Sequence, residues 1–129
     1  MNKNFIISVT GKRKTAIARI FLFTNGHRKF CVNGIDTKSY FKKLIDIIDK
    51  PFFIIKNNNF NLKCIVKGGG VSSQASAIQQ GISKALNIFN INYHSILKSN
   101  SLLTRDSRIV ERKKYGRHKA RKKFQFSKR

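Results

Sequence analysis

Acidic residues are scarce in this chain of 129 residues, which has five Asp and Glu against 28 Lys and Arg and a formal net charge of +23. Acid–base catalysis needs carboxylates placed together, and only Asp46 and Asp49, three residues apart on an expected helix, approach such a pair. Two exposed side chains on one helix surface are the simpler interpretation of that spacing. The scarcity of acids therefore predicts that the chain is not an enzyme.

Cysteine and histidine are also sparse. Cys31 and Cys64 stand far apart and match no zinc-ligand spacing. The histidines are scattered too, at His27, His94 and His118. Neither cysteine has an evident histidine partner, which disfavours a nucleophile. We expect both thiols to be reduced and buried as small apolar side chains, and we expect no metal and no cofactor.

Long apolar runs are absent. The longest apolar patches, such as residues 17–23 and 52–55, are broken or only as long as a strand, far short of the roughly 18 residues of a transmembrane helix. The charged residues Lys12, Arg13 and Lys14 are followed by only a short apolar run and by no small-residue cleavage site, so no signal peptide is expected. An Arg- and Ser-rich transit peptide is not recognisable either. The sequence thus predicts neither a membrane partner nor a targeting segment.

What the chain has in excess is positive charge, above all near its end. Residues 105–129 hold twelve Lys and Arg against two acids, a side-chain charge of +10. No helical apolar stripe runs through them, so they cannot bury enough surface to offset the entropy of ordering. A solvated, disordered tail is one interpretation. Given the charge of the whole chain, we favour an extended arm that orders on a nucleic acid.

This pattern divides the chain in two. Residues 1–102 are expected to form one globular domain, and residues 103–129 an extended basic tail. The tail cations that we assign to nucleic acid are Arg105, Arg108, Arg112, Lys113, Lys114, Arg117, Lys119, Arg121, Lys122 and Lys123.

The first quarter of the chain is rich in β-branched and aromatic residues. Residues 5–9 and 15–23 alternate or run apolar, which predicts one long strand interrupted at residues 11–14. Asn25-Gly26 predicts a hairpin turn. A return strand over residues 30–32 is then expected to close at a second turn, Asn33-Gly34.

A helix is expected next. Asp36 or Thr37 is placed to cap it, and apolar residues recur at helical spacing up to Ile48. Pro51 is expected to end this helix. Residues 52–55 are expected to form a strand or a loop.

In the second half of the domain the apolar residues recur with a clearer spacing. Residues 60–66 alternate as a half-buried strand, and residues 71–89 repeat at 3.6 spacing as a helix capped by Ser72 or Ser73. A last short helix begins over residues 91–97. The whole order predicts an α+β fold with helices on one face of a small sheet.

A cationic segment interrupts the first expected strand. Lys12, Arg13, Lys14 and Thr15 follow Gly11 there, and Arg19 comes shortly after. Such side chains supply the charge and the donors that phosphates need. The segment is either a solvated β-bulge or a site that contacts several phosphates, and we favour the second interpretation.

Three consecutive glycines, Gly68-Gly69-Gly70, separate an expected strand from the clearest helix. Glycines allow backbones to approach closely, and amides at a helix N-terminus attract an anion. Neither G-x-x-x-x-G-K-[ST] nor G-x-G-x-x-G is present, which argues against a nucleotide cofactor. A contact to a backbone phosphate of nucleic acid and a purely structural turn both stay open, and we favour the first. The flanking residues assigned to the same contact are Lys67, Ser72 and Gln74.

Four segments taken together resemble a known family. They are VTGKRKTAIARI (residues 9–20), VKGGGVSSQASAIQQGISKAL (66–86), LTRDSRIVERKKYGRHKAR (103–121) and QFSKR (125–129). In this order they resemble the universally occurring family of the ninth protein of the small ribosomal subunit, in its bacterial and organellar form. The resemblance covers nearly the whole chain, although residues 36–61 carry almost no family signature.

The resemblance implies a small ribosomal α+β domain with a left-handed βαβ crossover, an exception to the general right-handed rule. It implies a structural protein bound to the large RNA of the small subunit, in the subunit head beside other head proteins. The tail is expected to thread through RNA to the peptidyl site. There Ser127, Lys128 and Arg129 would approach the anticodon stem-loop of the transfer RNA. The cationic segment, the glycines and the tail then become contacts to ribosomal RNA.

Some positions depart from the family pattern. Val9-Thr10-Gly11 stands where Gly-Thr-Gly is common, and Ser72-Ser73-Gln74 stands where Ser-Gly-Gln is usual. Ser107 and Tyr115 occupy positions that are often proline, and a Gly-x-Gly of the hairpin is reduced to Gly26. These departures bear on the local backbone and leave the assignment intact. The expected location is the small ribosomal subunit, in a bacterial cytoplasm or inside a plastid or mitochondrion that encodes the chain.

Three other classes fit parts of the pattern. A DNA-packaging protein would share the charge but not a preference for the 2′-hydroxyl, which a matched RNA/DNA competition exposes. An enzyme that uses the glycine loop would bind a nucleotide without RNA. A membrane-surface peptide needs an amphipathic stripe, which the tail lacks.

Overall fold

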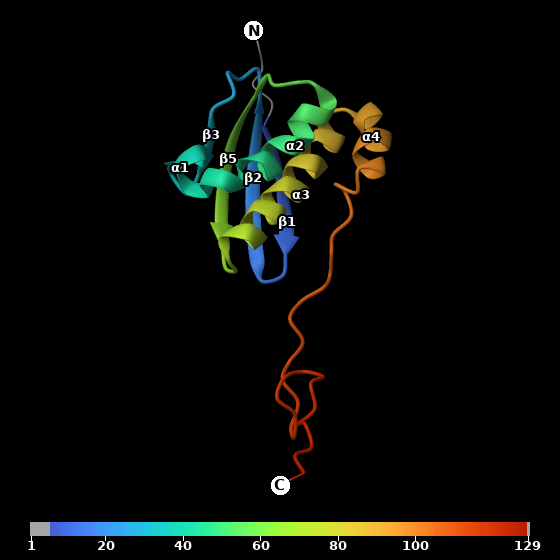
Figure 1. The fold of residues 1–129 in the computed structure, drawn as a ribbon. Coiled ribbons are helices and arrows are strands. Elements are labelled where there is room, and N and C mark those ends of the chain that lie inside the picture. The colour runs from blue at the N-terminus through green and yellow to red at the C-terminus, as the bar shows by residue number, and fades with distance from the viewer. Residues whose placement is uncertain (1–5, 129) are drawn as a thin grey trace.

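The structure, a computed structural model, describes residues 6–128. Its strands are β1 (Ile6–Arg13), β2 (Ala16–Thr24), β3 (Phe30–Val32), β4 (Ile35–Asp36) and β5 (Phe60–Lys67). Its helices are α1 (Thr37–Phe41), α2 (Ile45–Ile55), α3 (Val71–Phe89) and α4 (His94–Ser99), with 3₁₀ turns over Lys42–Leu44 and Ile91–Tyr93. The chain after α4 extends away from one end of the sheet (Figure 1).

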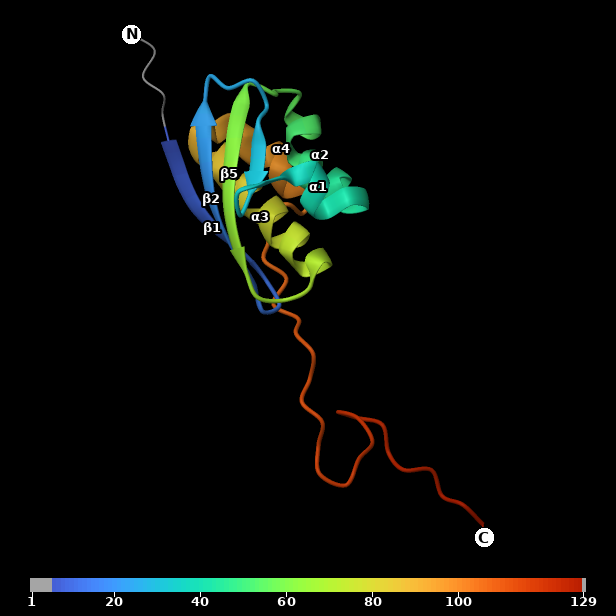
Figure 2. The ribbon, with the colours of Figure 1, turned by 90° about the vertical axis from the view of Figure 1, so that its left-hand side faces the viewer.

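The strands form one mixed sheet in the order β1-β2-β5-β3-β4. β1, β2 and β5 are antiparallel neighbours, whereas β3 runs parallel to β5 and carries β4 on its outer side. The helices α2, α3 and α4 lie together on one side of the sheet, and its other face is uncovered (Figure 2). The predicted α+β class with helices on one face is therefore confirmed.

Helix α3 lies at the centre of the core because its apolar face packs across β1 and β2. Two glycines allow this close approach. A Cβ on Gly11 would overlap the carbonyl oxygen of Ala77 and lie 2.7 Å from the backbone nitrogen of Gly81, and a Cβ on Gly81 would overlap the side chain of Ile20. The large side chains that fill the layer between helices and sheet are Ile20, Leu22, Val32, Ile48, Phe52, Phe60, Leu62, Ile78, Ile82, Leu86 and Leu97.

The prediction of one long interrupted strand over residues 5–23 is wrong, because β1 and β2 form a hairpin. Arg13 pairs with Ala16, so only Lys14 and Thr15 make the turn, and Lys14 takes a φ of 51°. Apolar alternation continues on both sides of the turn, and no Asn-Gly or Asp-Gly marks it. The cationic residues 12–15 are thus the hairpin tip and not a bulge. Phe5, predicted to begin the strand, lies outside the described residues.

The prediction of a tight hairpin at Asn25-Gly26 is also wrong. The strand that follows, β3, pairs with β5 and not with β2. The chain crosses past the end of β5 instead, where the N–H of Gly26 donates to the carbonyl of Asn59 at 3.1 Å. The second turn, Asn33-Gly34, is confirmed, with φ values of 51° and 82°, and it leads into the short strand β4 that the sequence did not predict.

The expected helix after residue 36 forms in two pieces, and Pro51 does not end it. Asp36 caps α1 as predicted, accepting from the N–H of Lys38 at 3.2 Å. Pro51 lies inside α2, and residues 52–55 are helical rather than a strand or loop. A proline there leaves the carbonyl of Ile47 without its helical donor. The side-chain amide of Gln79 on α3 donates to that carbonyl at 2.8 Å, which compensates for the loss.

The strand and the long helix of the second half are confirmed, and the last short helix forms as a 3₁₀ turn over Ile91–Tyr93 followed by α4. On β5 the residues Phe60, Leu62, Cys64 and Val66 are buried. Helix α3 spans the predicted residues, but its N-cap is Gly70 with no side-chain hydrogen bond, so the prediction of Ser72 or Ser73 as the cap is wrong.

Both cysteines are free. Cys31 is half-buried on β3, and Cys64 is buried on β5, so only Cys64 fits the predicted buried site in full. Burial, with a smaller effect of the neighbouring Cys31, raises the pKa of the Cys64 thiol to about 12. This thiol is therefore protonated, and unreactive, at neutral pH.

The contact between Gln79 and Ile47 leads to a testable prediction. Gln79→Ala leaves a half-buried carbonyl unpaired and should lower the free energy of unfolding by about 1–3 kcal/mol. In a Pro51→Ala background the new N–H of residue 51 donates to the same carbonyl. Gln79→Ala should then lower the free energy of unfolding clearly less than it does in the unchanged chain. Urea unfolding of the four proteins in this double-mutant cycle measures the difference. Equal costs in both backgrounds would contradict the compensation.

Candidate nucleic-acid interface

The predicted binding segments gather at one end of the molecule. The hairpin tip and the loop between β5 and α3 lie side by side at the end of the sheet from which the tail extends (Figures 1 and 2). The N–H of Lys12 donates to the side-chain oxygen of Gln80 on α3 at 3.0 Å, which holds the tip against the helix. The side chains of Lys12 and Lys14 are exposed there.

Arg13 joins the hairpin tip to the tail root, which we define as residues 102–108. Its guanidinium pairs with the carboxylate of Asp106 at 2.9 Å and donates to the carbonyls of Asp106 and Arg108 at 3.3 and 3.4 Å. The Arg13 side chain is 22% exposed. The structure therefore places Arg13 in a clamp on the tail, with its Nη1 engaged within the protein.

The glycine loop, residues 68–70, touches the hairpin at its tip. Gly68 and Gly69 have φ values of 76° and 65°, and a Cβ on Gly68 would lie 2.6 Å from the carbonyl oxygen of Thr15. These two glycines are required by the turn and by the close approach. Gly70 differs, because nothing lies within 4 Å of a Cβ placed on it. It precedes the first turn of α3, whose N-terminus has no side-chain cap.

Gln74 secures this loop from inside. Its amide nitrogen donates to the carbonyl of Gly68 at 3.0 Å, and its amide oxygen accepts from the hydroxyl of Tyr40 at 2.9 Å. The side chain is buried. Both polar atoms of Gln74 are thus used within the protein, whereas the predicted neighbours Lys67 and Ser72 are exposed.

Both acids of the tail pair with arginines. Arg108 donates to both carboxylate oxygens of Asp106, and this contact, with the charge of Arg13, holds the pKa of Asp106 well below its usual range. Arg121 does the same to Glu111, at 2.7 and 3.0 Å, and lowers the pKa of Glu111. The second pair closes a loop over residues 111–121, and the ring centroid of His118 in this loop lies 3.9 Å from that of Phe124.

The remaining tail cations are open to solvent. The exposed ones without an ion pair within the described residues are Arg105, Arg112, Lys113, Lys114, Lys119, Lys122, Lys123 and Lys128. Arg117 is half-buried and donates to the carbonyl of Arg121 at 2.9 Å. Ser127 is exposed, and Arg129 lies outside the described residues. The tail therefore presents mostly unpaired cations.

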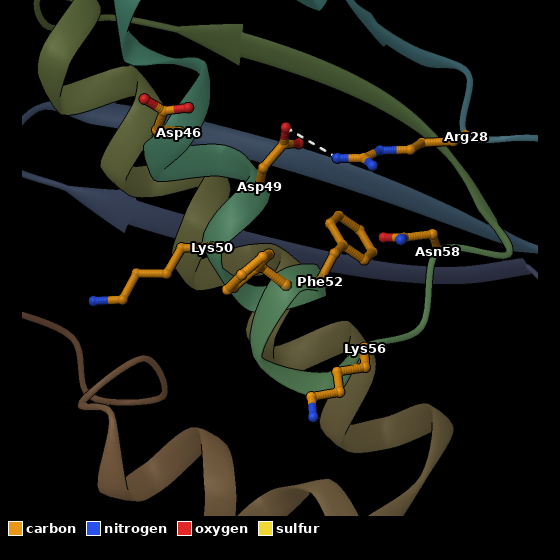
Figure 3. Close-up of a pocket in the computed structure, with 8 residues that line it drawn as sticks. Arg28, Asp46, Asp49, Lys50, Phe52, Lys56 and Asn58 are labelled. Carbon is orange, nitrogen blue, oxygen red and sulfur yellow. Dashed lines mark ion pairs between the residues drawn. The ribbon is translucent and has the colours of Figure 1, made fainter.

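A cavity of about 600 Å³ lies elsewhere, beside α2 (Figure 3). Arg28 and Asp49 of its lining form an ion pair at 3.0 Å, and Lys50 and Lys56 also line it. The charged residues of this lining are of both signs, and Asp49 is already held in the ion pair with Arg28, so the cavity has no pair of carboxylates placed for acid–base catalysis. Between residues 6 and 128 no group of His, Cys, Asp and Glu is placed to hold a metal. Among the same residues, no helix is both long and apolar enough to cross a membrane.

Two features of this interface were missed by the sequence analysis. The clamp of Arg13 on Asp106 joins residues that are 93 positions apart, and no local sequence pattern predicts it. Lys63 stands exposed on β5 in the same row as Phe21 and Ser8. The alternation of β5, which was recognised, places Lys63 on the face opposite to the core and could have identified it.

An α+β domain whose cationic loops meet at one end and continue into a basic arm has the features of a nucleic-acid-binding protein. Residues 11–129 match the family described as Ribosomal protein S9/S16. The chain belongs to this family. It is accordingly a structural constituent of the small ribosomal subunit, where it binds ribosomal RNA, and it is not an enzyme.

Individual relatives agree with this assignment. The small ribosomal subunit protein uS9 of Rickettsia bellii is 50% identical over 123 residues, which cover 93% of this chain and 74% of the relative. The protein of the same description from Cytophaga hutchinsonii is 45% identical over 127 residues, or 96% of this chain and 98% of the relative. That of Rickettsia prowazekii is 51% identical over 123 residues, or 93% and 76%.

The clamp leads to a second prediction. Arg13→Gln removes the ion pair and both carbonyl contacts, so amide exchange of residues 104–110 should accelerate while the core stays protected. Lys14→Gln at the next position is the matched control, since it loses the same charge and the Lys14 side chain makes no ion pair or hydrogen bond to any residue between 6 and 128. Because Asp106 keeps a lowered pKa through Arg108, the effect should persist from pH 5 to pH 8. Unchanged exchange in the Arg13 variant would show that the tail root is held by other contacts.

Proposed function

We propose that this chain binds the large RNA in the head of the small ribosomal subunit and that its tail reaches transfer RNA in the peptidyl site. Residues 1–102 act as the RNA-bound domain and residues 103–129 as the arm. One observation carries the proposal: the hairpin tip, the glycine loop and the tail root meet at one end, and the tail continues outward from there (Figure 1).

The residues divide by their surroundings. The exposed side chains of Lys12, Lys14, Arg19 and Lys67 grip phosphates, as do the unpaired tail cations. The backbone at Gly70 and the hydroxyl of Ser72 sit at the uncapped start of α3, where an anion is favoured. Arg13, Thr15, Gly68, Gly69 and Gln74 shape the loops, because each is engaged within the protein.

The resemblance also implies a left-handed connection between the parallel strands β3 and β5, contacts to neighbouring proteins of the subunit head, and no small-molecule substrate. We place the chain in a bacterial cytoplasm or inside an organelle that encodes it, and the bacterial relatives fit the first.

Binding to ribosomal RNA should weaken steeply with salt. If the hairpin tip and tail neutralise on the order of ten phosphates, log K falls with log salt at a slope near −7 to −9. Filter binding of the chain to head-domain RNA between 0.1 and 0.4 M salt measures this slope, with DNA of the same sequence as competitor. A slope shallower than about −3, or equal competition by DNA, would contradict the proposal.

Removal of residues 127–129 tests the contact to transfer RNA. The truncated chain should fold and assemble, because its domain and most tail cations remain. Peptidyl-site transfer RNA should bind more weakly by about 1–2 kcal/mol, since charge-assisted contacts are lost but codon and ribosomal RNA contacts persist. The loss should vary little among transfer RNAs, because phosphate contacts position and do not specify.

The control is Lys128→Gln with Arg129→Gln, which keeps the length and removes the charge. It should match the truncation. Transfer RNA affinity is measured on purified subunits that carry each variant at full occupancy. Unchanged affinity in both variants would show that these residues do not touch transfer RNA, without affecting the binding of ribosomal RNA.

A further inference from the structure

The proposed function uses some cations of the sheet face opposite the helices and none of the aromatic side chains between them. We call this face the open face. It is formed by alternate residues of three antiparallel strands, which the pairing aligns in rows from the hairpin tip outward: Lys12–Ile17–Lys67, Thr10–Arg19–Ile65, Ser8–Phe21–Lys63 and Ile6–Phe23–Asn61. The row of Lys12 and Lys67 borders the hairpin tip, so the open face continues the candidate interface.

The charges of the open face are all of one sign. Its cations are Lys12, Arg19, Lys63 and Lys67, and none of its twelve residues is acidic. The side chains of these four cations make no ion pair and no hydrogen bond to any residue between 6 and 128. Arginines elsewhere, such as Arg28 and Arg121, do form ion pairs with carboxylates. The open face is thus a set of cations left without partners in the protein.

Apolar side chains stand between these cations. Ile6, Ile17 and Ile65 are 56%, 48% and 40% exposed, and the rings of Phe21 and Phe23 are half-buried on the same strand. Two residues apart on a strand, Phe21 and Phe23 lie about 7 Å from each other. Aromatic side chains on the surface of a sheet are a platform on which unpaired bases stack.

We propose that the open face docks on ribosomal RNA, with unpaired bases on Phe21 and Phe23 and phosphates on Arg19, Lys63 and Lys67. The inference rests on the proposed function and adds a second contact surface to it. A protein partner on this face would have to bury four unpaired cations at a high desolvation cost. RNA supplies both the negative charge and the flat apolar rings, so it is the occupant that this face fits.

The first experiment compares two triple variants of the full chain on head-domain RNA. Arg19→Gln, Lys63→Gln and Lys67→Gln remove three cations of the open face. Lys42→Gln, Lys43→Gln and Lys50→Gln remove three exposed cations of the 3₁₀ turn and α2. The open-face variant should bind about ten- to a hundredfold more weakly and lose about 2 from its salt slope, while the control changes affinity only about threefold. Equal effects of the two variants would overturn the inference.

The second experiment tests stacking. Phe21→Leu with Phe23→Leu keeps the face apolar, and thermal unfolding checks that the variant is folded. Its affinity for head-domain RNA should fall about five- to tenfold, because leucine cannot stack on a base. Affinity equal to that of the unchanged chain would overturn the inference.

A photo-crosslinker at Ser8 in reconstituted small subunits identifies the occupant directly. A crosslink to ribosomal RNA supports the inference, and a crosslink to a ribosomal protein overturns it. These outcomes are separate from the proposed function. If the unchanged chain shows no preference for head-domain RNA over unrelated RNA, the proposed function fails. If it shows that preference and the open-face variants lose no more affinity than the control, the open face is excluded together with the phosphate contacts of Arg19 and Lys67, while the contacts of the tip and the tail remain.

Discussion

The backbone of β1 touches the backbone of α3 at Gly11, and the rest of the structure depends on that contact. No side chain fits between Gly11 and the turn of α3 that holds Ala77 and Gly81. One residue further, the N–H of Lys12 reaches Gln80. The next residue, Arg13, then holds the tail root. The direction in which the tail leaves the domain is therefore set by how closely one strand lies on one helix.

This contact also explains a departure from the family pattern. Where the family commonly has Gly-Thr-Gly, this chain has Val9-Thr10-Gly11. Val9 is half-buried against the core, where a side chain is accommodated. The glycine that the chain retains is the one without room for a Cβ. The packing of α3 on β1 therefore requires a glycine at position 11 and allows a larger residue at position 9.

The sequence predicts those elements whose burial is periodic and local. The strand over residues 60–66 and the helix over residues 71–89 alternate or repeat without interruption, and both form as expected. The β1–β2 turn was missed because its two residues carry no turn signature. Pro51 was misjudged because its effect is cancelled by Gln79, a partner from another helix. The clamp of Arg13 on Asp106 is equally non-local. For Pro51 and for the clamp, what the sequence could not supply is a contact between distant residues.

The few acids of the chain determine which of its cations are free. Every ion pair among residues 6–128 joins an acid to an arginine: Arg13, Arg28, Arg108 or Arg121. The planar guanidinium matches a carboxylate at two points, and the ammonium of lysine does not. Lysines are consequently left unpaired at the hairpin tip, across the open face and along the tail. Their mutual repulsion destabilises the isolated chain, and a polyanion relieves it. The ion pairs thus shape the arm and the loops, and the unpaired lysines supply the attraction to RNA, so folding and binding draw on different cations of one strongly basic sequence.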